Sequence, residues 1–378
     1  MNLFDVYSLL DMEPVKAQGA YLWDKKGEEY LDFYGGHAVI SIGHTHPHYV
    51  EKISEQLSKI GFYSNAVINS LQVELAEKLG ALSGYDDYSL FLCNSGAEAN
   101  ENALKLASFT TGRERVLAIK AAFHGRTSLA VTVTDNPAIQ APVNKSDKIS
   151  FVELNDVEAL REELQKGEYA AVIIEPIQGV GGIQVASDEF LMAAREACDA
   201  TGTMLIADEI QAGYGRSGKF FSHQWSGVKA DIITLAKGIG NGFPIGAVMI
   251  SPLIPAKKGM LGTTFGGSHL ACAAAIAVAD VVKDENLVEN ARVMGEKIMT
   301  GIAGVSGVKD IRGRGLIIGI DLSVPQADFR KVLREKHHIM TGLTGQYTLR
   351  LLPPLMIGQK EVDRFVEAFR ATAQEMEM

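Results

Sequence analysis

Five short apolar runs between residues 89 and 250 constrain the fold of this chain more than any other feature. Segments with helical periodicity separate these runs. Short runs that alternate with helices are typical of strands buried between two helical layers, as in parallel sheets. The sequence therefore predicts an α/β fold built on a mostly parallel sheet. The runs are 90–93, 116–119, 171–174, 204–207 and 232–236.

Two of these runs end in a charged side chain. Asp208 follows the run 204–207, and Lys237 follows the run 232–236 and opens the glycine-rich segment KGIGNG. The carboxyl ends of parallel strands lie at one edge of the sheet, where ligands bind in open α/β folds. A lysine that can form a Schiff base, facing a carboxylate for a pyridinium nitrogen, is what pyridoxal phosphate (PLP) chemistry requires. A PLP site is therefore the working hypothesis.

A tight turn leads from strand to helix in the segment LFLCNSGAEANENALKLA. Asn94 or Ser95 can cap the helix, and Gly96 lets the backbone approach an anion closely. The amides of Gly96 and Ala97 would then point at a phosphate at the positive end of the helix dipole. Phe123 could stack on a flat heteroaromatic ring. Alone, each feature equally fits an ordinary capped helix or a core aromatic, but together they match the handles of one cofactor.

Composition and charge exclude several functional classes. The net charge of −10 argues against nucleic acid or an anionic membrane as a general partner. No signal peptide is visible, and the most apolar stretch, 270–282, is too short to cross a bilayer. Three widely spaced cysteines without a CxxC pair indicate a reducing cytoplasm. His44, His46 and His48 have no nearby carboxylate or cysteine to complete a ligand set, so we expect no metal site.

The two ends of the chain predict a second, smaller unit. Residues 21–33 predict two short strands around a polar turn, and a long helical region begins after residue 268. We expect an N-terminal arm (1–45) that contributes to a small domain, a large domain (46–285) and a C-terminal α+β domain (286–378). In the last of these the pattern predicts strand 315–322, helix 326–337, strand 348–352 and helix 359–376.

Eight segments occur in one order along nearly the whole chain: GHTHPHYV, FLCNSGAEANENALKLA, AAFHGRT, IIEPIQGVGG, LIADEIQAGYGRSG, LAKGIGNGFPIGAV, TTFGGSHLAC and IRGRGLIIGI. This set resembles the class III (ornithine-type) aminotransferases, and within them the acetylornithine and succinylornithine aminotransferase branch. The resemblance implies fold type I of the PLP-dependent transferases, with a seven-stranded, mostly parallel sheet in the large domain. It also implies a homodimer whose active sites are shared between the two chains.

The resemblance assigns a role to each residue around the cofactor ring. Lys237 would form the Schiff base and afterwards move the proton between the substrate carbon and the cofactor carbon. Asp208 would keep the ring nitrogen protonated. Gln211 would bond the phenolic oxygen of the ring, and Phe123 would stack on its face.

The resemblance also assigns residues to the phosphate and to the second subunit. Gly96 and Ala97 would bind the phosphate. Thr264 would reach the phosphate in the neighbouring subunit's site, with Thr263 beside it near the substrate. The active site would then be made by two chains.

Two arginines match the family's carboxylate-binding positions. Arg126 would anchor the substrate carboxylate, because a planar guanidinium pairs two-pronged with a carboxylate; otherwise it is a surface arginine in a loop. Arg350 would bind the carboxylate of 2-oxoglutarate or glutamate, although its short motif equally fits a strand edge in the small domain. Glu175, before Pro176, either supports the pocket wall or is a solvated strand end.

The chain departs from the family pattern at several positions. Val180 replaces a glutamate that neutralises the second arginine in ornithine-type relatives. We hypothesise that Arg350 therefore stays available in both half-reactions, which would favour a donor with an extra acid group. His37, Ser268 and His269 also replace the usual residues, and these changes bear on the substrate.

The sequence thus predicts an aminotransferase that moves the terminal amino group of N-acetylornithine or N-succinylornithine to 2-oxoglutarate. The products would be the semialdehyde and glutamate, in arginine biosynthesis. One alternative is a 4-aminobutyrate, ornithine or other ω-amino acid aminotransferase of the same class. Another is a non-catalytic protein that keeps the fold as a binding module, and retention of Lys237, Asp208, Gln211 and Arg126 argues against it.

Overall fold

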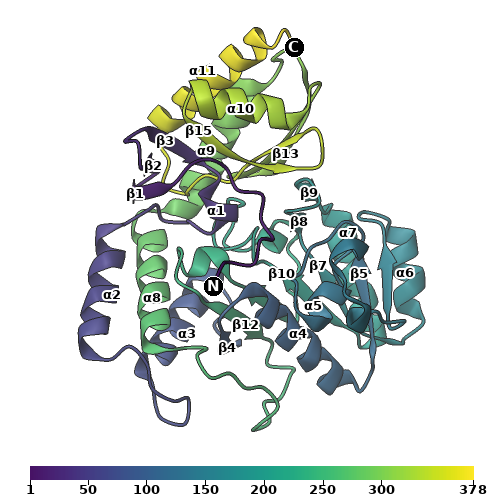
Figure 1. The fold of residues 1–378 in the computed structure, drawn as a ribbon. Coiled ribbons are helices and arrows are strands. Elements are labelled where there is room, and N and C mark those ends of the chain that lie inside the picture. Colours follow the sequence, from purple (N-terminus) through teal and green to yellow (C-terminus); the bar gives the residue numbers. More distant parts are fainter.

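The computed structural model describes residues 1–378 and contains two seven-stranded sheets. The larger part of the molecule is built on a sheet of order β4-β12-β11-β10-β7-β5-β6 (Figure 1). All pairs from β11 to β6 are parallel, whereas β12 is antiparallel to both of its neighbours. The strands are β4 (Ser89–Cys93), β5 (Arg115–Ile119), β6 (Ile149–Val152), β7 (Tyr169–Ile174), β10 (Met204–Asp208), β11 (Ile232–Leu235) and β12 (Gly246–Ile250).

Helices cover both faces of this sheet, as the sequence predicts. Successive side chains of a strand point to opposite faces. In β5, Val116 and Ala118 join one buried cluster with α4, while Leu117 and Ile119 join the other with α6 and α7. The helices of this part are α2 (Pro47–Lys59), α3 (Ser70–Ser83), α4 (Gly96–Thr111), α5 (Ser128–Thr132), α6 (Val157–Gln165), α7 (Asp188–Thr201) and α8 (His269–Asp284).

The second sheet joins strands from both ends of the chain, in the order β1-β2-β3-β15-β16-β14-β13. Strand β3 pairs in parallel with β15, with Leu31 opposite Ile339. Phe33 of β3 stacks on Phe365 of α11 at 4.7 Å between ring centroids. The domain boundaries at 45/46 and 285/286 stay a prediction. The elements are β1 (Pro14–Gln18), β2 (Tyr21–Asp24), β3 (Glu29–Phe33), β13 (Val308–Arg314), β14 (Ile317–Leu322), β15 (Ile339–Thr344), β16 (Thr348–Leu351), α9 (Leu287–Ile302), α10 (Gln326–Lys336) and α11 (Gln359–Glu375).

Short elements lie in the connections between these strands and helices. They are α1 (Gly35–Ala38), the two-stranded β8 (Ile177–Gln178) and β9 (Gln184–Val185), and the 3₁₀ turns η1 (Pro137–Ile139), η2 (Pro142–Asn144), η3 (Ser222–Ser226) and η4 (Lys237–Ile239). None of the helices is long and apolar enough to cross a lipid bilayer.

The structure differs from the sequence prediction in a few elements. Strands β1, β6, β8, β9, β12, β13 and β15 were not predicted. The single long helical region expected after residue 268 is two helices, because Asn286 adopts φ 51° between α8 and α9. A left-handed residue cannot continue a right-handed helix.

Candidate active site

The two charged strand ends lie side by side, as predicted. Strands β10 and β11 are adjacent and parallel, with Asp208 opposite Thr234. Lys237 follows β11 directly and opens the turn η4. Its backbone has φ 50°, in the left-handed region that non-glycine residues rarely adopt. Such strain tends to be kept at ligand sites, where it fixes a side chain in one direction.

The surroundings of Lys237 favour its neutral amine. Burial lowers the pKa of Lys237, and the nearby positive charges of Arg350 and Arg216 lower it further. The negative charges of Asp208 and Glu175 act in the opposite direction on this pKa. Because only a neutral amine is nucleophilic, the net direction suits a lysine that condenses with an aldehyde.

Asp208 is buried and held by three hydrogen bonds. Its Oδ2 accepts from His124 Nδ1 at 2.7 Å and from Asn100 Nδ2 at 2.8 Å. Its Oδ1 accepts from the Ile210 amide at 3.1 Å. Two donors on one oxygen fix the plane of the carboxylate.

His124 and Asn100 were missed by sequence reasoning. Asn100 lies on α4, where its Oδ1 also accepts from Thr234 Oγ1 at 2.8 Å and its Nδ2 donates to the His124 carbonyl at 2.8 Å. It therefore ties the phosphate-loop helix to the strands. The available signals were a polar residue on the buried face of α4, four positions after Gly96, and a histidine next to Phe123.

The N-terminus of α4 has the form expected of an anion site. Ser95 is the cap, because its Oγ accepts from the Glu98 amide at 3.2 Å. A Cβ on Gly96 would lie 2.9 Å from Ile210, and a Cβ on Gly125 would lie 2.8 Å from the Ala97 side chain. The amides of Gly96 and Ala97 begin the helix and have no helical acceptor.

Phe123 and Glu175 form one wall of the site. Phe123 is half-buried, and its amide donates to Glu175 Oε2 at 2.9 Å. Glu175 Oε1 accepts from the Gly179 amide at 3.2 Å. Only 6% of Glu175 is exposed, so it supports the pocket wall and the alternative of a solvated strand end is wrong.

Gln211 lies against the same wall. Its Nε2 donates to the His37 carbonyl at 3.2 Å, whereas its buried Oε1 has no partner within the chain. A Cβ on Gly179 would lie 1.7 Å from this oxygen, so any other residue there would displace the Gln211 amide. A buried amide oxygen without a partner is costly, and a ring hydroxyl would satisfy it.

Arg350 belongs to the interior of the second sheet. Strand β16 lies between β15 and β14, so the alternative of a strand edge is wrong. Arg350 Nη1 donates to the Gly179 carbonyl at 2.8 Å, and the buried Nε of Arg350 has no acceptor. Burial lowers the pKa of Arg350. A buried guanidinium with an unused donor is suited to a carboxylate ligand.

The structure does not bring the remaining predicted residues into this cluster. Arg126 is exposed in the loop between β5 and α5, and Thr264 is exposed as well. Thr263 lies nearer the phosphate turn, because its Oγ1 accepts from Asn94 Nδ2 at 3.4 Å. The roles of these three residues stay predictions.

The three clustered histidines have separate partners. His44 Nε2 lies 2.8 Å from Asp32, His46 Nε2 lies 2.9 Å from Glu285, and His48 Nε2 lies 3.1 Å from Asp280. His44 therefore holds the segment before α2 to β3, whereas His46 and His48 both connect the start of α2 to the C-terminal part of α8.

The groups at this sheet edge fit PLP. The helix N-terminus offers amides to a phosphate, the anchored Asp208 offers a carboxylate to a ring nitrogen, and Lys237 offers an amine to an aldehyde. Fold and site together define a PLP-dependent transferase of fold type I. A family model described as "Aminotransferase class-III" matches residues 6–372. The chain belongs to the class-III aminotransferases, which confirms the predicted fold class, cofactor and family.

Individual relatives agree with this placement. An acetylornithine aminotransferase of Methanosarcina mazei is 40% identical over 356 residues, covering 93% of this chain and 89% of that protein. The ornithine aminotransferase of Toxoplasma gondii has a TM-score of 0.93 at 30% identity, covering 99% and 93% of the two chains. An acetylornithine aminotransferase of Elizabethkingia anophelis has a TM-score of 0.88 at 32% identity, covering 98% and 96%.

We expect the buried acid of this site to make folding stability depend on pH. Burial raises the pKa of Glu175 to about 7, from 4.5. Between these values the folded protein holds the proton more tightly than the unfolded chain, so stability falls as pH rises. Relative to Glu175→Gln, the cofactor-free protein should lose up to about 3 kcal/mol of unfolding free energy between pH 4.5 and 8. Urea unfolding at several pH values measures this, and a constant difference would contradict it.

Proposed function

We propose that this protein transfers the terminal amino group of N-acetylornithine or N-succinylornithine to 2-oxoglutarate. The products are the corresponding semialdehyde and glutamate, and the reaction serves arginine biosynthesis in the cytoplasm. The names of the M. mazei and E. anophelis relatives support an acylated ornithine as donor. The observation that carries the proposal is the buried Arg350, which forms no ion pair with a carboxylate of the chain. It donates to the Gly179 carbonyl at the edge of the sheet where Lys237 lies.

In this proposal each residue at the sheet edge has one task. PLP, when bound, supplies the electron sink for the reacting carbon. The Lys237 amine binds the cofactor aldehyde and moves the proton. Asp208 holds a proton on the ring nitrogen, with His124 and Asn100 keeping its carboxylate in place. Phe123 supports the ring face.

Three further groups complete the cofactor site in this proposal. The amides of Gly96 and Ala97 hold the phosphate. Gln211 bonds the ring oxygen, with its amide fixed by the His37 carbonyl.

Two arginines receive carboxylates in this proposal. Arg126 pairs with the donor carboxylate and thereby fixes the end that does not react. Arg350 pairs with the carboxylate of 2-oxoglutarate. No carboxylate of the chain forms an ion pair with Arg350, and Val180 exposes an apolar side chain near it. A donor that carries a second acid group, such as N-succinylornithine, therefore remains the hypothesis for this chain.

A donor panel tests the proposal. Initial rates with 2-oxoglutarate should be compared for N-acetylornithine, N-succinylornithine, ornithine and 4-aminobutyrate. We expect kcat/KM for one acylated donor to exceed that for free ornithine by at least about ten-fold, because a pocket shaped for an acyl group loses its contacts otherwise. Preference for free ornithine would support the second candidate, which the likeness to the T. gondii enzyme favours. Strong preference for the acetyl donor would contradict the hypothesis drawn from Val180.

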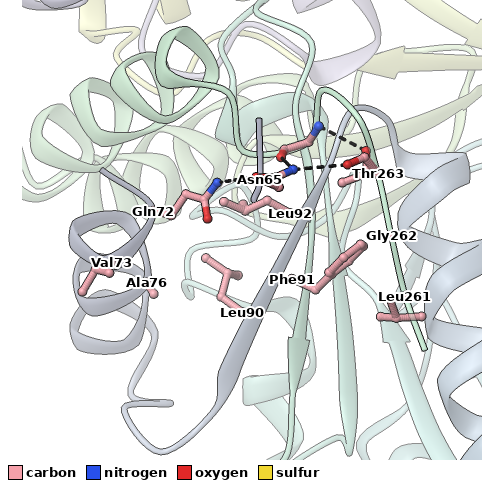
Figure 2. A pocket seen from close by; sticks show the side chains of 11 residues that line it. Asn65, Gln72, Val73, Ala76, Leu90, Phe91, Leu92, Leu261, Gly262 and Thr263 are labelled. Atoms are coloured by element: carbon pink, nitrogen blue, oxygen red, sulfur yellow. Dashed lines mark hydrogen bonds between the residues drawn. The ribbon is translucent and has the colours of Figure 1, made fainter. Parts of the chain in front are cut away.

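We also propose a homodimer with shared active sites, because one face of the large domain exposes many apolar side chains. No residue of α2 is buried, and Leu57 is 62% exposed. Val73 on α3 and Phe265 are 57% and 61% exposed. Val73 also lines a groove whose side chains are drawn in Figure 2. It is lined by Asn65, Gln72, Val73, Ala76, Leu90, Phe91, Leu92, Leu261, Gly262, Thr263 and Gly266.

A second copy of this chain is the occupant we assign to this groove. Patches of apolar surface this extensive are characteristic of interfaces. Thr263 lines the groove, and Thr264 next to it is exposed. A partner docked here therefore lies next to Thr264, as the shared-site prediction requires.

Mixed dimers provide a direct test of shared sites. We expect Lys237→Ala and Thr264→Ala homodimers both to lose activity, for different reasons. Co-refolding the two variants should restore activity, because one site of each heterodimer then combines an intact Lys237 with an intact Thr264. With random pairing about half of the dimers are mixed and have one intact site each, so about a quarter of the wild-type activity should return. No recovery in a sample shown to be mixed would exclude a site made by two chains.

A further inference from the structure

We propose that Glu175 is a positioning residue that holds the Phe123 loop and the Gly179–Arg350 contact in one arrangement. A single carboxylate thereby sets both the wall behind the cofactor ring and the arginine that receives the keto acid. The part of the inference that concerns Arg350 rests on the proposed function.

The connection runs through two backbone amides and one carbonyl. Glu175 Oε2 accepts from the Phe123 amide at 2.9 Å, and Oε1 accepts from the Gly179 amide at 3.2 Å. The carbonyl of Gly179 in turn accepts from Arg350 Nη1 at 2.8 Å. The carboxylate and the guanidinium are thus linked through one residue, although they form no direct ion pair. Movement of the Gly179 amide would displace the acceptor of Arg350.

The turn after Glu175 has little freedom to move on its own. Gln178 Nε2 donates to the Lys120 carbonyl at 2.7 Å, which attaches the turn to the Phe123 loop a second time. A Cβ on Gly181 would lie 2.7 Å from the Ala121 carbonyl, so the two backbones are in close contact there. The two segments therefore behave as one unit, with the Glu175 carboxylate at its centre.

The same turn is also attached to the second sheet. Thr344 Oγ1 donates to the Val180 carbonyl, and Arg312 Nε donates to the Gly182 carbonyl at 2.8 Å. Together with Arg350 these bonds connect the turn to β15, β13 and β16. Glu175 anchors this connection to the large sheet, because it directly follows β7 and is buried.

The charged groups around Glu175 make the strength of its two hydrogen bonds depend on pH. Those that face it are His124 on the loop after β5, Asp208 at the end of β10, Lys237 in η4 and Arg350 on β16. Burial favours the protonated acid, and His124 favours the carboxylate. Bonds from backbone amides to an ionised carboxylate are about twice as strong as neutral ones. Ionisation of Glu175 therefore tightens the hold on Phe123 and Gly179.

The variant Glu175→Gln weakens this pair of hydrogen bonds with little change in the shape of the side chain. Its amide nitrogen would face one of the two backbone amides that Glu175 now binds, so one hydrogen bond is lost. The matched control is Glu153→Gln, an exposed carboxylate that directly follows β6 at the same edge of the sheet. Glu175→Ala, which removes both bonds, should show a larger effect in the same direction.

The kinetic readout separates the two half-reactions. We expect Glu175→Gln to raise the KM for 2-oxoglutarate about ten-fold, the usual effect of one lost bond to a charged group. The donor half-reaction, measured without keto acid and with N-acetylornithine, which has no second acid group for Arg350, should change less than about three-fold. The wild-type kcat/KM for 2-oxoglutarate should rise with pH near neutrality, and this rise should be absent in Glu175→Gln. Equal losses in both half-reactions, or an unchanged pH profile, would overturn the inference.

Hydrogen exchange of the cofactor-free protein supplies a readout that needs no activity. At a pH below 7, where the folded protein keeps Glu175 protonated and its ionisation does not lower stability, peptides covering 121–126 and 177–182 should exchange faster in Glu175→Gln than in wild type and in Glu153→Gln. If wild type does not aminate 2-oxoglutarate, the proposed function fails, while the exchange comparison still decides whether Glu175 holds these segments. Exchange rates in Glu175→Gln equal to those in Glu153→Gln would contradict the positioning role itself.

Discussion

Replacing Lys237 with alanine is expected to lower kcat by roughly 10³-fold or more, the usual cost of losing a covalent nucleophile. Burial lowers the pKa of this amine, and its φ of 50° fixes the direction of the side chain. Of the two strands that pair with β10, only β11 is followed by a lysine. No neighbouring lysine can therefore replace the Lys237 amine as nucleophile.

Steady-state kinetics and peptide mapping together check this prediction. Borohydride reduction of the PLP-bound protein should leave the cofactor attached to the peptide that contains Lys237. The matched control, Lys145→Ala, removes an exposed lysine and should keep wild-type turnover. Normal turnover in Lys237→Ala, or attachment of the cofactor elsewhere, would contradict the assignment.

The second large effect is expected for Asp208→Asn. The side chain keeps its shape but loses its charge, and its Oδ2 position now accepts from both His124 and Asn100. If the amide nitrogen of the new asparagine takes the Oδ2 position, it is a donor that faces the donors of His124 and Asn100. If its amide oxygen takes that position, the ring nitrogen faces an amide group instead of a carboxylate. Removing one partner of a buried charged pair costs about 3–5 kcal/mol, which corresponds to roughly 10²- to 10⁴-fold in kcat/KM.

Kinetics and cofactor titration measure the loss. The PLP dissociation constant should also rise, because the ring loses its charged partner. An exposed aspartate provides the control, Asp147→Asn, which should behave as wild type. An Asp208→Asn protein with unchanged kcat/KM would show that the carboxylate does not act on the ring.

The strands and the charged edge could be predicted because their signals are local. Each of the five apolar runs became a strand of the large sheet, and two of them delivered Asp208 and Lys237 to neighbouring positions. The sequence left open whether Asn94 or Ser95 caps α4, since both types can do so. The hydrogen bond from the Glu98 amide decides for Ser95.

The missed parts depend on contacts between distant segments. His124 and Asn100 serve Asp208 from 84 and 108 residues away in sequence. Glu175 looked ambiguous because its burial follows from the turn at Gly179 and the loop at Phe123, which no local pattern encodes. Strand β13 was missed because at the sheet edge it carries charged residues and no fully buried one.

The parallel pairing of β3 with β15 has a consequence for how the chain forms. Residues 29–33 must wait for residues 339–344 before their ladder can close, which is a contact of very high sequence separation. Such contacts slow folding, because a long loop is closed before any hydrogen bond rewards it. During synthesis the first three strands leave the ribosome long before their partner exists. Until residues 339–344 are made, the side of β3 that pairs with β15 has no partner strand.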